Sequence, residues 1–390
     1  MRVRRVDIGM DATAGRTLPP ALFYGFAVAS IGGPLALAVI YVPGAADMRS
    51  AGLVTLLGAA LYAAPLLVWV RFSRDVVSPA GLAGFVEAAA GRRLALVQAA
   101  VWAFSYFLYL PYTVTDIVYE MLATVFPGIE PWRPLLEVVI PIAIVALLLL
   151  GTLPALRVLA VSAVLQLGIL VVLGAAVIHH VGAPSDSFTH AHGLRPGAAN
   201  VALLFVCGSL PLFLGAEVTG GSRTIRRALP IAGVVAAAYV AFAVFAFAAV
   251  DPALRNQELP GYAIAGAYSG RTLAIVVGVG AAASVAGLIV AEYLALSRLL
   301  FAFTGVPIRR LVSIIAVPFV ALDALSLLDP EWFDEHVLRP SLIALYLSQL
   351  IVFAVYPLHR RRPVDVALAA IASALMAWGL WRGITAPVAT

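Results

Sequence analysis

The sequence predicts an all-α protein that crosses a membrane many times, and three of its features agree on this. The 390 residues are 63% hydrophobic and only 12% charged, their mean hydropathy is +1.01, and the apolar residues fall into runs of spanning length. A soluble chain carries roughly twice that charged fraction. Lipid must therefore replace water around much of the surface, which predicts a multi-pass protein of the cell membrane.

Eleven apolar runs are long enough to cross a bilayer, for which a helix needs about 20 mostly apolar residues. They cover residues 20–43, 51–70, 94–125, 135–151, 157–178, 199–218, 229–250, 272–303, 311–328, 338–357 and 364–382. The third and eighth runs exceed a perpendicular crossing, so we expect them to tilt or to project beyond the lipid.

The arginines predict the orientation of these crossings. The chain contains no lysine, and 18 of its 25 basic residues fall in segments that are cytoplasmic if the N-terminus is cytoplasmic. Because cytoplasmic loops are enriched in basic residues, this asymmetry favours a cytoplasmic N-terminus, an external C-terminus and a cytoplasmic tail over residues 1–19. Clusters of this kind between apolar runs determine topology, so we expect no nucleic-acid partner.

Two runs contain helix breakers near the middle of the membrane. The first contains Gly32, Gly33 and Pro34, and the sixth contains glycine, serine and proline between residues 208 and 215. A kink or a packing contact would explain either one alone. Two breaks five crossings apart, in helices of opposite direction, instead indicate an inverted repeat of residues 20–178 and 199–357, with 364–382 as an additional eleventh helix.

Three segments resemble the amino acid–polyamine–organocation (APC) transporter superfamily. FLGAEVTGGSRTIRRALP, in the sixth run and its loop, is similar to the family's F-x-G-F-E pattern followed by basic residues, I-x-R-A and a proline. LALSRLLFAF is similar to the family's A-S-R-L-L-F-A segment, and RFSRDVVSPAGLAGFVEAAAGR looks like its loop before the third span. The resemblance covers the first eight runs. It implies a leucine-transporter-like fold of two inverted five-helix repeats, and an amino acid or related amine as substrate.

The first run matches the family only in part, because its IGGP and YVPGA segments lie too far apart to match together. The same run is similar to the related natural-resistance-associated metal-ion transporters. Their aspartate and asparagine are replaced here by Val42 and Ala45, and their Met-Pro-His segment is replaced by Leu210-Pro211-Leu212. The oxygen ligands for a divalent metal are therefore missing, and we expect no metal transport.

The two breaks are the predicted substrate site. A broken helix leaves free N–H groups at one half-helix end and free carbonyls at the other, which suits a carboxylate and an ammonium group. We therefore predict these substrate-binding residues: Ser30, Ile31, Gly32 and Gly33 in the first run, and Cys207, Gly208, Ser209, Leu210 and Phe213 in the sixth. The resemblance implies that Phe213 closes over the substrate, and a core or lipid-facing phenylalanine is the alternative.

Six other residues are candidates for gating or ion coupling: Tyr109, Asp116, Glu217, Ser284, Glu292 and Arg298. The first two lie in the outer part of the third run, where an interfacial tyrosine and a solvated carboxylate are the alternatives. The two glutamates and Arg298 lie toward the inner ends of their runs and predict either an ion-paired gate or a static pair. Ser284 is a candidate sodium ligand by the resemblance, but neither sodium nor proton coupling is assigned.

Three functional hypotheses follow. The first is a secondary transporter for an amino acid or related amine. The second is a membrane sensor or receptor that keeps the fold and binds a ligand without moving it. A membrane enzyme is set aside, because the sequence has no G-x-S-x-G, P-loop or dinucleotide motif. No cofactor is expected, and the histidines of one outer loop (179, 180, 190 and 192) lack the cysteine or carboxylate that would complete a metal site.

Overall fold

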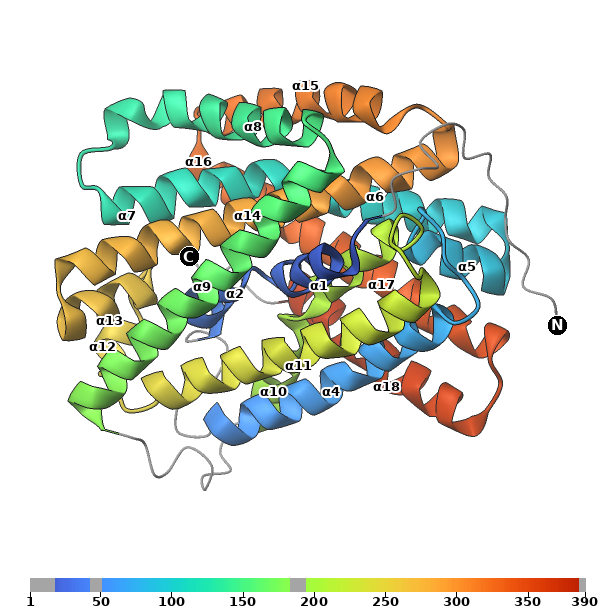
Figure 1. Ribbon diagram of the computed structural model, residues 1–390, viewed down its shortest axis with the longest axis horizontal. Helices are drawn as coiled ribbons and strands as arrows, with labels where there is room; N and C mark the ends of the chain where they lie inside the picture. Colours follow the sequence, from blue (N-terminus) through green and yellow to red (C-terminus); the bar gives the residue numbers. More distant parts are fainter. Residues whose placement is uncertain (1–17, 43–50, 183–193, 386–390) are drawn as a thin grey trace.

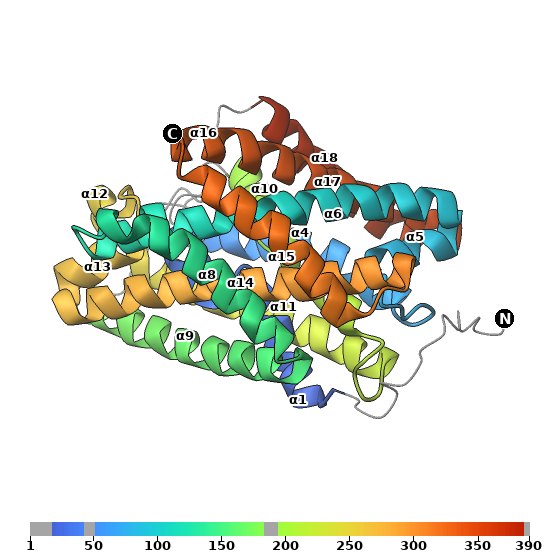
Figure 2. The ribbon, with the colours of Figure 1, turned by 90° about the horizontal axis from the view of Figure 1, so that it is seen from above.

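The computed structural model describes residues 18–42, 51–182 and 194–385, and within them every regular element is a helix. Most helices run along the long axis of the molecule (Figures 1 and 2). The described residues form no sheet, and one isolated parallel bridge joins Leu18 to Val218. The predicted all-α class is therefore confirmed. Most of the predicted N-terminal tail, and His190 and His192, lie outside the described residues.

Nine helices of the described chain are long and apolar enough to cross a membrane. They are Pro20–Ile40, Gly52–Phe72, Arg92–Val125, Glu130–Leu149, Thr152–Val181, Ser222–Phe247, Arg271–Thr304, Pro330–His359 and Pro363–Thr385. The other two predicted runs correspond to α15 (Ile308–Ser326), which carries Arg309, Arg310 and Asp323, and to the short apolar segment Ala198–Leu214. The multi-pass prediction is confirmed, and each of the eleven runs coincides with helical structure.

The first run is broken where its glycines predict. Helix α1 (Pro20–Ala29) ends before Ser30, and α2 (Pro34–Ala36) begins after Gly33 and continues into the π-helical segment η1 (Leu37–Tyr41). Gly32 and Gly33 have φ angles of 68° and 65°. Residues with a side chain rarely adopt such angles, and Pro34 favours the start of a new helix. The break is thus encoded by adjacent residues.

The sixth run is broken at the predicted residues, but the interruption begins earlier than predicted. Helix α10 (Leu194–Leu203) ends in a turn at residues 204–205, and η5 (Val206–Leu214) follows as a 3-10 helix. The interruption therefore begins four residues before Gly208. Pro211 lies inside η5 and supplies no backbone donor, which weakens a regular α-helix and favours the tighter form. The predicted break is confirmed, but the second half is 3-10 rather than α-helical.

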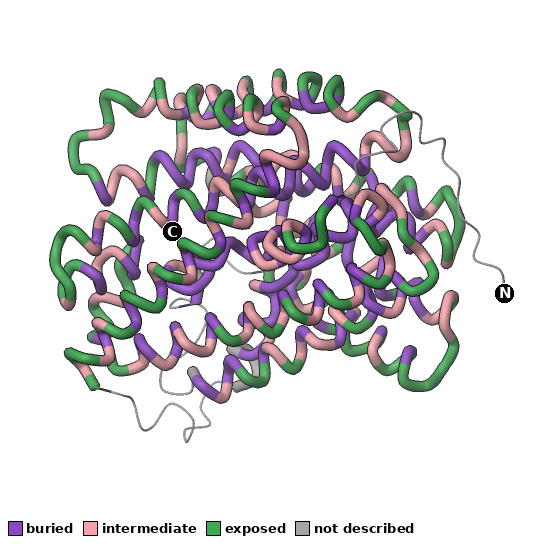
Figure 3. Tube along the Cα trace, viewed as in Figure 1, coloured by how far each residue is buried: buried purple, intermediate pink, exposed green. Residues whose placement is uncertain are grey.

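The broken helices lie at the centre of the bundle. Helix α1 packs against α9 (Thr152–Val181), α11 (Ser222–Phe247) and α14 (Arg271–Thr304). Helix α14 also packs against α6 (Arg92–Thr115), which contacts α17 (Arg339–His359). Figure 3 shows buried residues gathered along these central helices and exposed residues on the outermost ones.

The remaining helices cover the edges of the bundle. At one edge α8 (Arg133–Leu149) pairs with α15, and at the other α4 (Ala51–Phe72) packs against α10, α11 and α18 (Pro363–Thr385) (Figure 1). Their outward faces are apolar, as lipid requires; Val317 on α15 is 72% exposed. The short connecting elements are α5 (Leu82–Ala90), η3 (Asp116–Leu122), α7 (Ala123–Val125), η4 (Glu130–Trp132), α12 (Pro252–Arg255), α13 (Pro260–Ser269), α16 (Pro330–Phe333) and η6 (Asp334–Leu338).

Candidate functional site

The polar groups freed by the first break have mostly found partners within the protein. The Ile31 carbonyl accepts a hydrogen bond of 3.0 Å from the Tyr239 hydroxyl of α11. The Ser30 hydroxyl donates to the carbonyl of Ala27 at 3.0 Å. For the N–H groups of Gly32 and Gly33, both buried, no acceptor is found among the described residues. A buried N–H group without a partner is costly, so these two are the donors still available to an anionic group.

The first turn of α2 is capped by two side chains from other helices. The Ser284 hydroxyl of α14 accepts from the N–H of Ala36 at 3.2 Å and donates to the Gln166 side-chain oxygen at 2.7 Å. The same Gln166 oxygen accepts from the N–H of Leu35 at 3.4 Å. These two N–H groups are therefore engaged by Gln166 and Ser284. Ser284, a candidate sodium ligand by the family resemblance, acts as a helix cap in this structure.

A prediction follows from this cap. Substituting alanine for Ser284 is expected to destabilise the protein by about 1 to 2 kcal/mol, because one N–H group and the Gln166 oxygen lose a buried partner. The measurement is the unfolding temperature of purified protein with and without sodium. If Ser284 is only a cap, the loss is the same in both conditions. A loss confined to sodium-containing buffer would instead identify Ser284 as a sodium ligand.

Close contact between α2 and α14 depends on Gly33. A Cβ atom added there would lie 2.5 Å from the Ser284 hydroxyl oxygen and 2.7 Å from its carbonyl oxygen. At Gly32, which has a similar φ, the nearest atom would be a Leu37 methyl at 3.4 Å. A side chain at Gly32 would therefore cause backbone strain alone, whereas a side chain at Gly33 would cause backbone strain and a steric overlap with Ser284.

Alanine at Gly33 is expected to destabilise the protein by about 2 to 4 kcal/mol, since a left-handed residue with a side chain is strained and the overlap with Ser284 adds to it. Alanine at Gly32 meets the strain alone, and we expect about 1 to 2 kcal/mol. Thermal unfolding of both variants in the same detergent measures the difference. Equal losses at the two positions would show that the helices do not approach each other at Gly33.

The second broken helix meets the first at Gly208. A Cβ atom on this glycine would lie 2.1 Å from the Tyr62 hydroxyl of α4 and 3.4 Å from a side-chain carbon of Ile31. The neighbouring Ser209 hydroxyl accepts from the side-chain amide of Gln349 on α17 at 3.0 Å. The structure therefore brings Ile31, Gly208 and Ser209 to one place, where four helices converge.

Four polar side chains gather next to this meeting point. Cys207 is half-buried, and it interacts electrostatically with Tyr62 of α4, Tyr106 of α6 and Glu292 of α14. The Tyr62 hydroxyl and both carboxyl oxygens of Glu292 have no hydrogen-bond partner among the described residues. Glu292 is 0% exposed. These residues, Tyr62, Tyr106, Cys207 and Glu292, are called the central chamber below.

An unpaired carboxyl in such a place is unusual. Ionisable side chains inside membrane proteins are costly and nearly always face a partner, a cavity or a ligand. Within the described chain no arginine or histidine forms an ion pair with Glu292. The chamber therefore has one unsatisfied acceptor group of potential negative charge, and it lies beside the break in the second helix.

Phe213 is one ring away from Tyr106 of the central chamber, because Trp102 packs on both, with 4.1 Å between the ring centroids of Trp102 and Tyr106. Its ring is 1% exposed and packs on Trp102 of α6, with 4.4 Å between ring centroids. On its other side is Gly81, just before α5, where a Cβ atom would be 2.5 Å from the ring. Leu210, in the preceding turn of η5, is fully buried. Phe213 thus fills the space between the second broken helix and the inner loop that precedes α5.

Below the chamber, at the end that the arginines assign to the cytoplasm, Arg298 joins three segments. It donates to both carboxylate oxygens of Glu217, at 2.8 and 3.2 Å, and to the Thr152 hydroxyl at the start of α9. Arg298 is 1% exposed and Glu217 is 27% exposed. Of the two glutamates predicted near this arginine, the structure pairs Glu217 with it and leaves Glu292 unpaired.

The segment before α1 is tied to the same place. The N–H of Leu18 donates to the Glu217 carbonyl at 2.7 Å, and the N–H of Thr219 donates to the Leu18 carbonyl at 3.1 Å. The start of the first broken helix, the end of the second, α9 and α14 are therefore held together by a few polar contacts. We call Leu18, Thr152, Glu217 and Arg298 the inner linkage.

Tyr109 and Asp116 lie farther out on the third spanning helix. Tyr109 is half-buried, with its ring 5.7 Å from that of Tyr112, and Asp116 begins the π-helical segment η3. Asp116 is ten residues beyond Tyr106, or about 15 Å along a helix axis. Tyr109 therefore lies next to Tyr106 at the edge of the central chamber, and Asp116 lies farther along the helix.

Several residues at the site were missed by the sequence analysis. They are the partners of the broken segments and the lining of the chamber: Tyr62, Trp102, Thr152, Tyr239 and Gln349. Three of them, Tyr62, Tyr239 and Gln349, are polar residues well inside apolar runs. Since polar groups in lipid-spanning helices face the bundle interior, that position alone was a usable signal.

Comparison with known proteins is informative at the level of three-dimensional structure. No protein-family model matches the chain, and no curated protein matches it in sequence. Among solved structures, MhsT in complex with L-phenylalanine has 15% identity and a TM-score of 0.64, over 92% of this chain and 97% of MhsT. A manganese transporter of Eremococcus coleocola has 13% identity and a TM-score of 0.63, over 94% and 87% of the two chains.

A third structure is a sodium-coupled sialic acid symporter, with 15% identity and a TM-score of 0.61 over 96% of this chain and 91% of the symporter. At such identities the likeness concerns the fold. Nearly complete coverage of both chains means that the whole spanning bundle is shared. With its two broken helices crossing at the centre, this chain is an integral membrane protein of the leucine-transporter fold.

Proposed function

We propose that this protein is a secondary transporter that moves an amino acid or related amine across the cell membrane by alternating access. The substrate binds between the two broken helices. The observation that carries the proposal is Glu292, a buried carboxyl with no hydrogen-bond partner in the described chain, which lies in the same cluster of polar groups as Cys207 of the second broken helix. A protonated amine would supply the missing hydrogen-bond donors and the opposite charge.

Hydrogen-bond donors for the carboxylate end of an amino acid are available at the first break. The N–H groups of Gly32 and Gly33, which have no acceptor among the described residues, suit a carboxylate, and Gly33 packs directly on Ser284. From Ser284 to Glu292 is eight residues, or about 12 Å along a straight helix. The Glu292 side chain leans back toward Ser284, as helical side chains do, which shortens this span. The spacing favours a substrate whose amine is remote from its carboxylate over one that has both on one carbon.

The fold admits other cargoes, and the residues at the breaks discriminate among them. Divalent metals prefer several oxygen ligands, whereas Val42 and Leu212 are apolar at positions where the related metal-ion transporters carry ligands. A sensor with this fold would bind the same amine and would not release it on the other side. The inner linkage supports transport, because breaking a few polar contacts would free one face of the chamber.

Uptake by purified protein in proteoliposomes tests this function. Radiolabelled basic, neutral and acidic amino acids and a diamine are each supplied with an inward sodium gradient, an inward proton gradient, or no gradient. Saturable uptake of an amine-bearing compound above that of empty liposomes is expected. Saturable binding without uptake would establish the sensor, and absence of both for every amine would overturn the proposal.

A further inference from the structure

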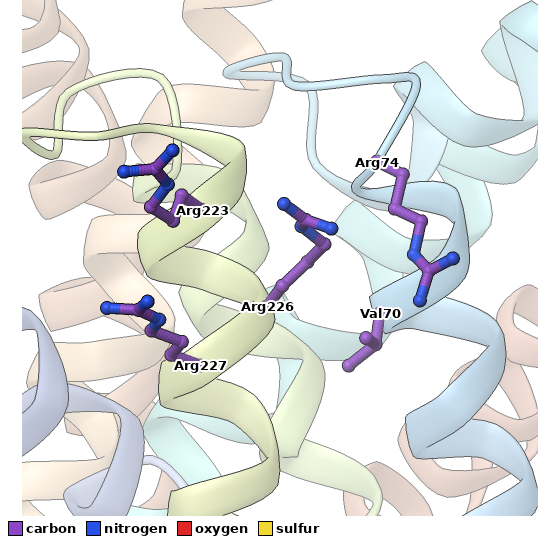
Figure 4. A pocket seen from close by; sticks show the side chains of 5 residues that line it. All are labelled: Val70, Arg74, Arg223, Arg226 and Arg227. Atoms are coloured by element: carbon purple, nitrogen blue, oxygen red, sulfur yellow. The ribbon is translucent and has the colours of Figure 1, made fainter.

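A pocket that shares no residue with the central chamber lies between the inner ends of α4 and α11. It encloses about 300 Å³ and is lined by Val70, Arg74, Arg223, Arg226 and Arg227. Figure 4 shows Arg226 reaching from α11 toward Arg74 at the end of α4, with Arg223 and Arg227 on the same first turns of α11. This arginine pocket therefore concentrates four positive charges around one cavity.

The described part of the chain supplies no counter-charge to these arginines. The acids nearest to these arginines in sequence are already paired: Asp75 with Arg360 and His359, and Glu217 with Arg298. The pocket also lies at the N-terminal end of α11, whose backbone dipole adds positive potential. Cations at a helix N-terminus repel that dipole, so an anion in the pocket would relieve both repulsions.

The walls of the pocket are fixed rather than loosely apposed. The Ser222 hydroxyl at the start of α11 donates to the Ser73 carbonyl at the end of α4. About two turns along α11 from the arginines, a Cβ atom on Gly233 would lie 2.9 Å from Leu66 of α4. The two helices therefore meet closely, and the gap at their inner ends is a built feature of the fold.

An apolar strip leads from the pocket along the lipid-facing side of the same helices. Ile231 and Val234 follow Arg227 by four and seven residues, so all three share one face of α11. They are 48% and 69% exposed, and Leu67 on α4 is 39% exposed. Charge at the membrane surface followed by exposed apolar side chains matches a molecule with an anionic head and a hydrocarbon tail.

We propose that the arginine pocket binds the phosphate of an anionic phospholipid of the cytoplasmic leaflet, with an acyl chain lying on the strip formed by Leu67, Ile231 and Val234. Arginine is suited to phosphate because its planar guanidinium group donates two parallel hydrogen bonds. Arginines at this membrane face also determine the topology of the chain, and any arginine there would serve that purpose. The pocket adds a defined place for one headgroup, and this is what the experiment must detect.

Native mass spectrometry of the purified protein tests the proposal with two matched double variants. R226Q/R227Q removes two charges from the pocket, and R309Q/R310Q removes two exposed charges from the start of α15 at the same membrane face. Each is incubated with phosphatidylglycerol, with phosphatidylcholine, or with phosphatidylglycerol plus inorganic phosphate. We expect one phosphatidylglycerol to be retained by the native protein and by R309Q/R310Q, and retained roughly 10-fold or more weakly by R226Q/R227Q.

Three results would overturn the proposal. Equal loss in both double variants would mean that the lipid responds to diffuse surface charge. Equal retention of phosphatidylcholine would mean that net negative charge is not recognised. Displacement of the lipid by millimolar inorganic phosphate would assign the pocket to a free anion. Circular dichroism and gel filtration of R226Q/R227Q show whether the variant keeps the native fold, so that a lost lipid is not mistaken for lost structure.

Discussion

Glutamine at Glu292 is expected to reduce the kcat/KM for uptake of an amine substrate roughly 100-fold or more, because the substrate ammonium would enter a buried chamber without its counter-charge. The amide keeps the size of the side chain and retains one acceptor oxygen, so packing around Cys207 and Tyr106 changes little. The measurement is initial uptake in proteoliposomes, with the native protein and Glu292→Gln at matched density.

The control is Glu258→Gln, which removes an exposed carboxylate before α13 and is expected to leave uptake unchanged. If a neutral substrate is transported, its kcat/KM for uptake should fall far less than that of a cationic substrate, because only the cation depends on the charge of Glu292. Unchanged uptake of a cationic substrate by Glu292→Gln would remove the assignment of this residue to the substrate. The transporter function itself is tested separately, by the uptake of the different amino acids and the diamine into proteoliposomes.

Alanine at Glu217 is expected to destabilise the protein by about 3 to 5 kcal/mol, because it leaves Arg298 buried without its counter-charge. The Thr152 hydroxyl would remain as a neutral partner, which cannot balance the charge. The measurement is thermal unfolding in detergent. Glu217 is partly exposed, so the lower end of this range is the more reasonable expectation.

A double variant separates a gate from a static pair. Glu217→Leu combined with Arg298→Met has no unpaired charge, and replacing a buried ion pair with apolar residues is often neutral for stability. If the inner linkage is a gate, this variant regains stability but opens more often, and Cys207 reacts faster with a membrane-impermeant maleimide from the cytoplasmic side. Cys207 is the single cysteine of the chain, so labelling reports on the chamber alone. Restored stability with an unchanged labelling rate would show a static pair.

The features predicted best are those that depend on local chemistry. Two neighbouring glycines followed by proline are enough to end one helix and start another, wherever that segment lies in the fold. The length and apolarity of the runs predicted which segments are helical, since lipid leaves the backbone no alternative to helix. The 3-10 form of η5 was missed, because proline and glycine weaken an α-helix without specifying what replaces it.

The roles of the charged residues could not be predicted from the sequence. Glu217 and Glu292 were equivalent candidates for pairing with Arg298. Glu292 is on the same helix as Arg298 but six residues away, and such positions do not face each other. Glu217 lies on a different element, and only the packing of η5 against α14 brings it within hydrogen-bond distance. The sequence also left the role of Phe213 undetermined, because its contact with Trp102 joins two helices that are more than 100 residues apart.

The sequence by itself determined that this protein lies in a membrane, which segments are apolar helices and where the first helix breaks, because each of these depends on the composition of a single segment. The tertiary structure alone decided which freed backbone groups are capped by Gln166, Ser284 and Tyr239, and which carboxyl stays unpaired. Those outcomes depend on side chains that meet from different helices, and a pairing across a bundle is fixed only when the helices have packed.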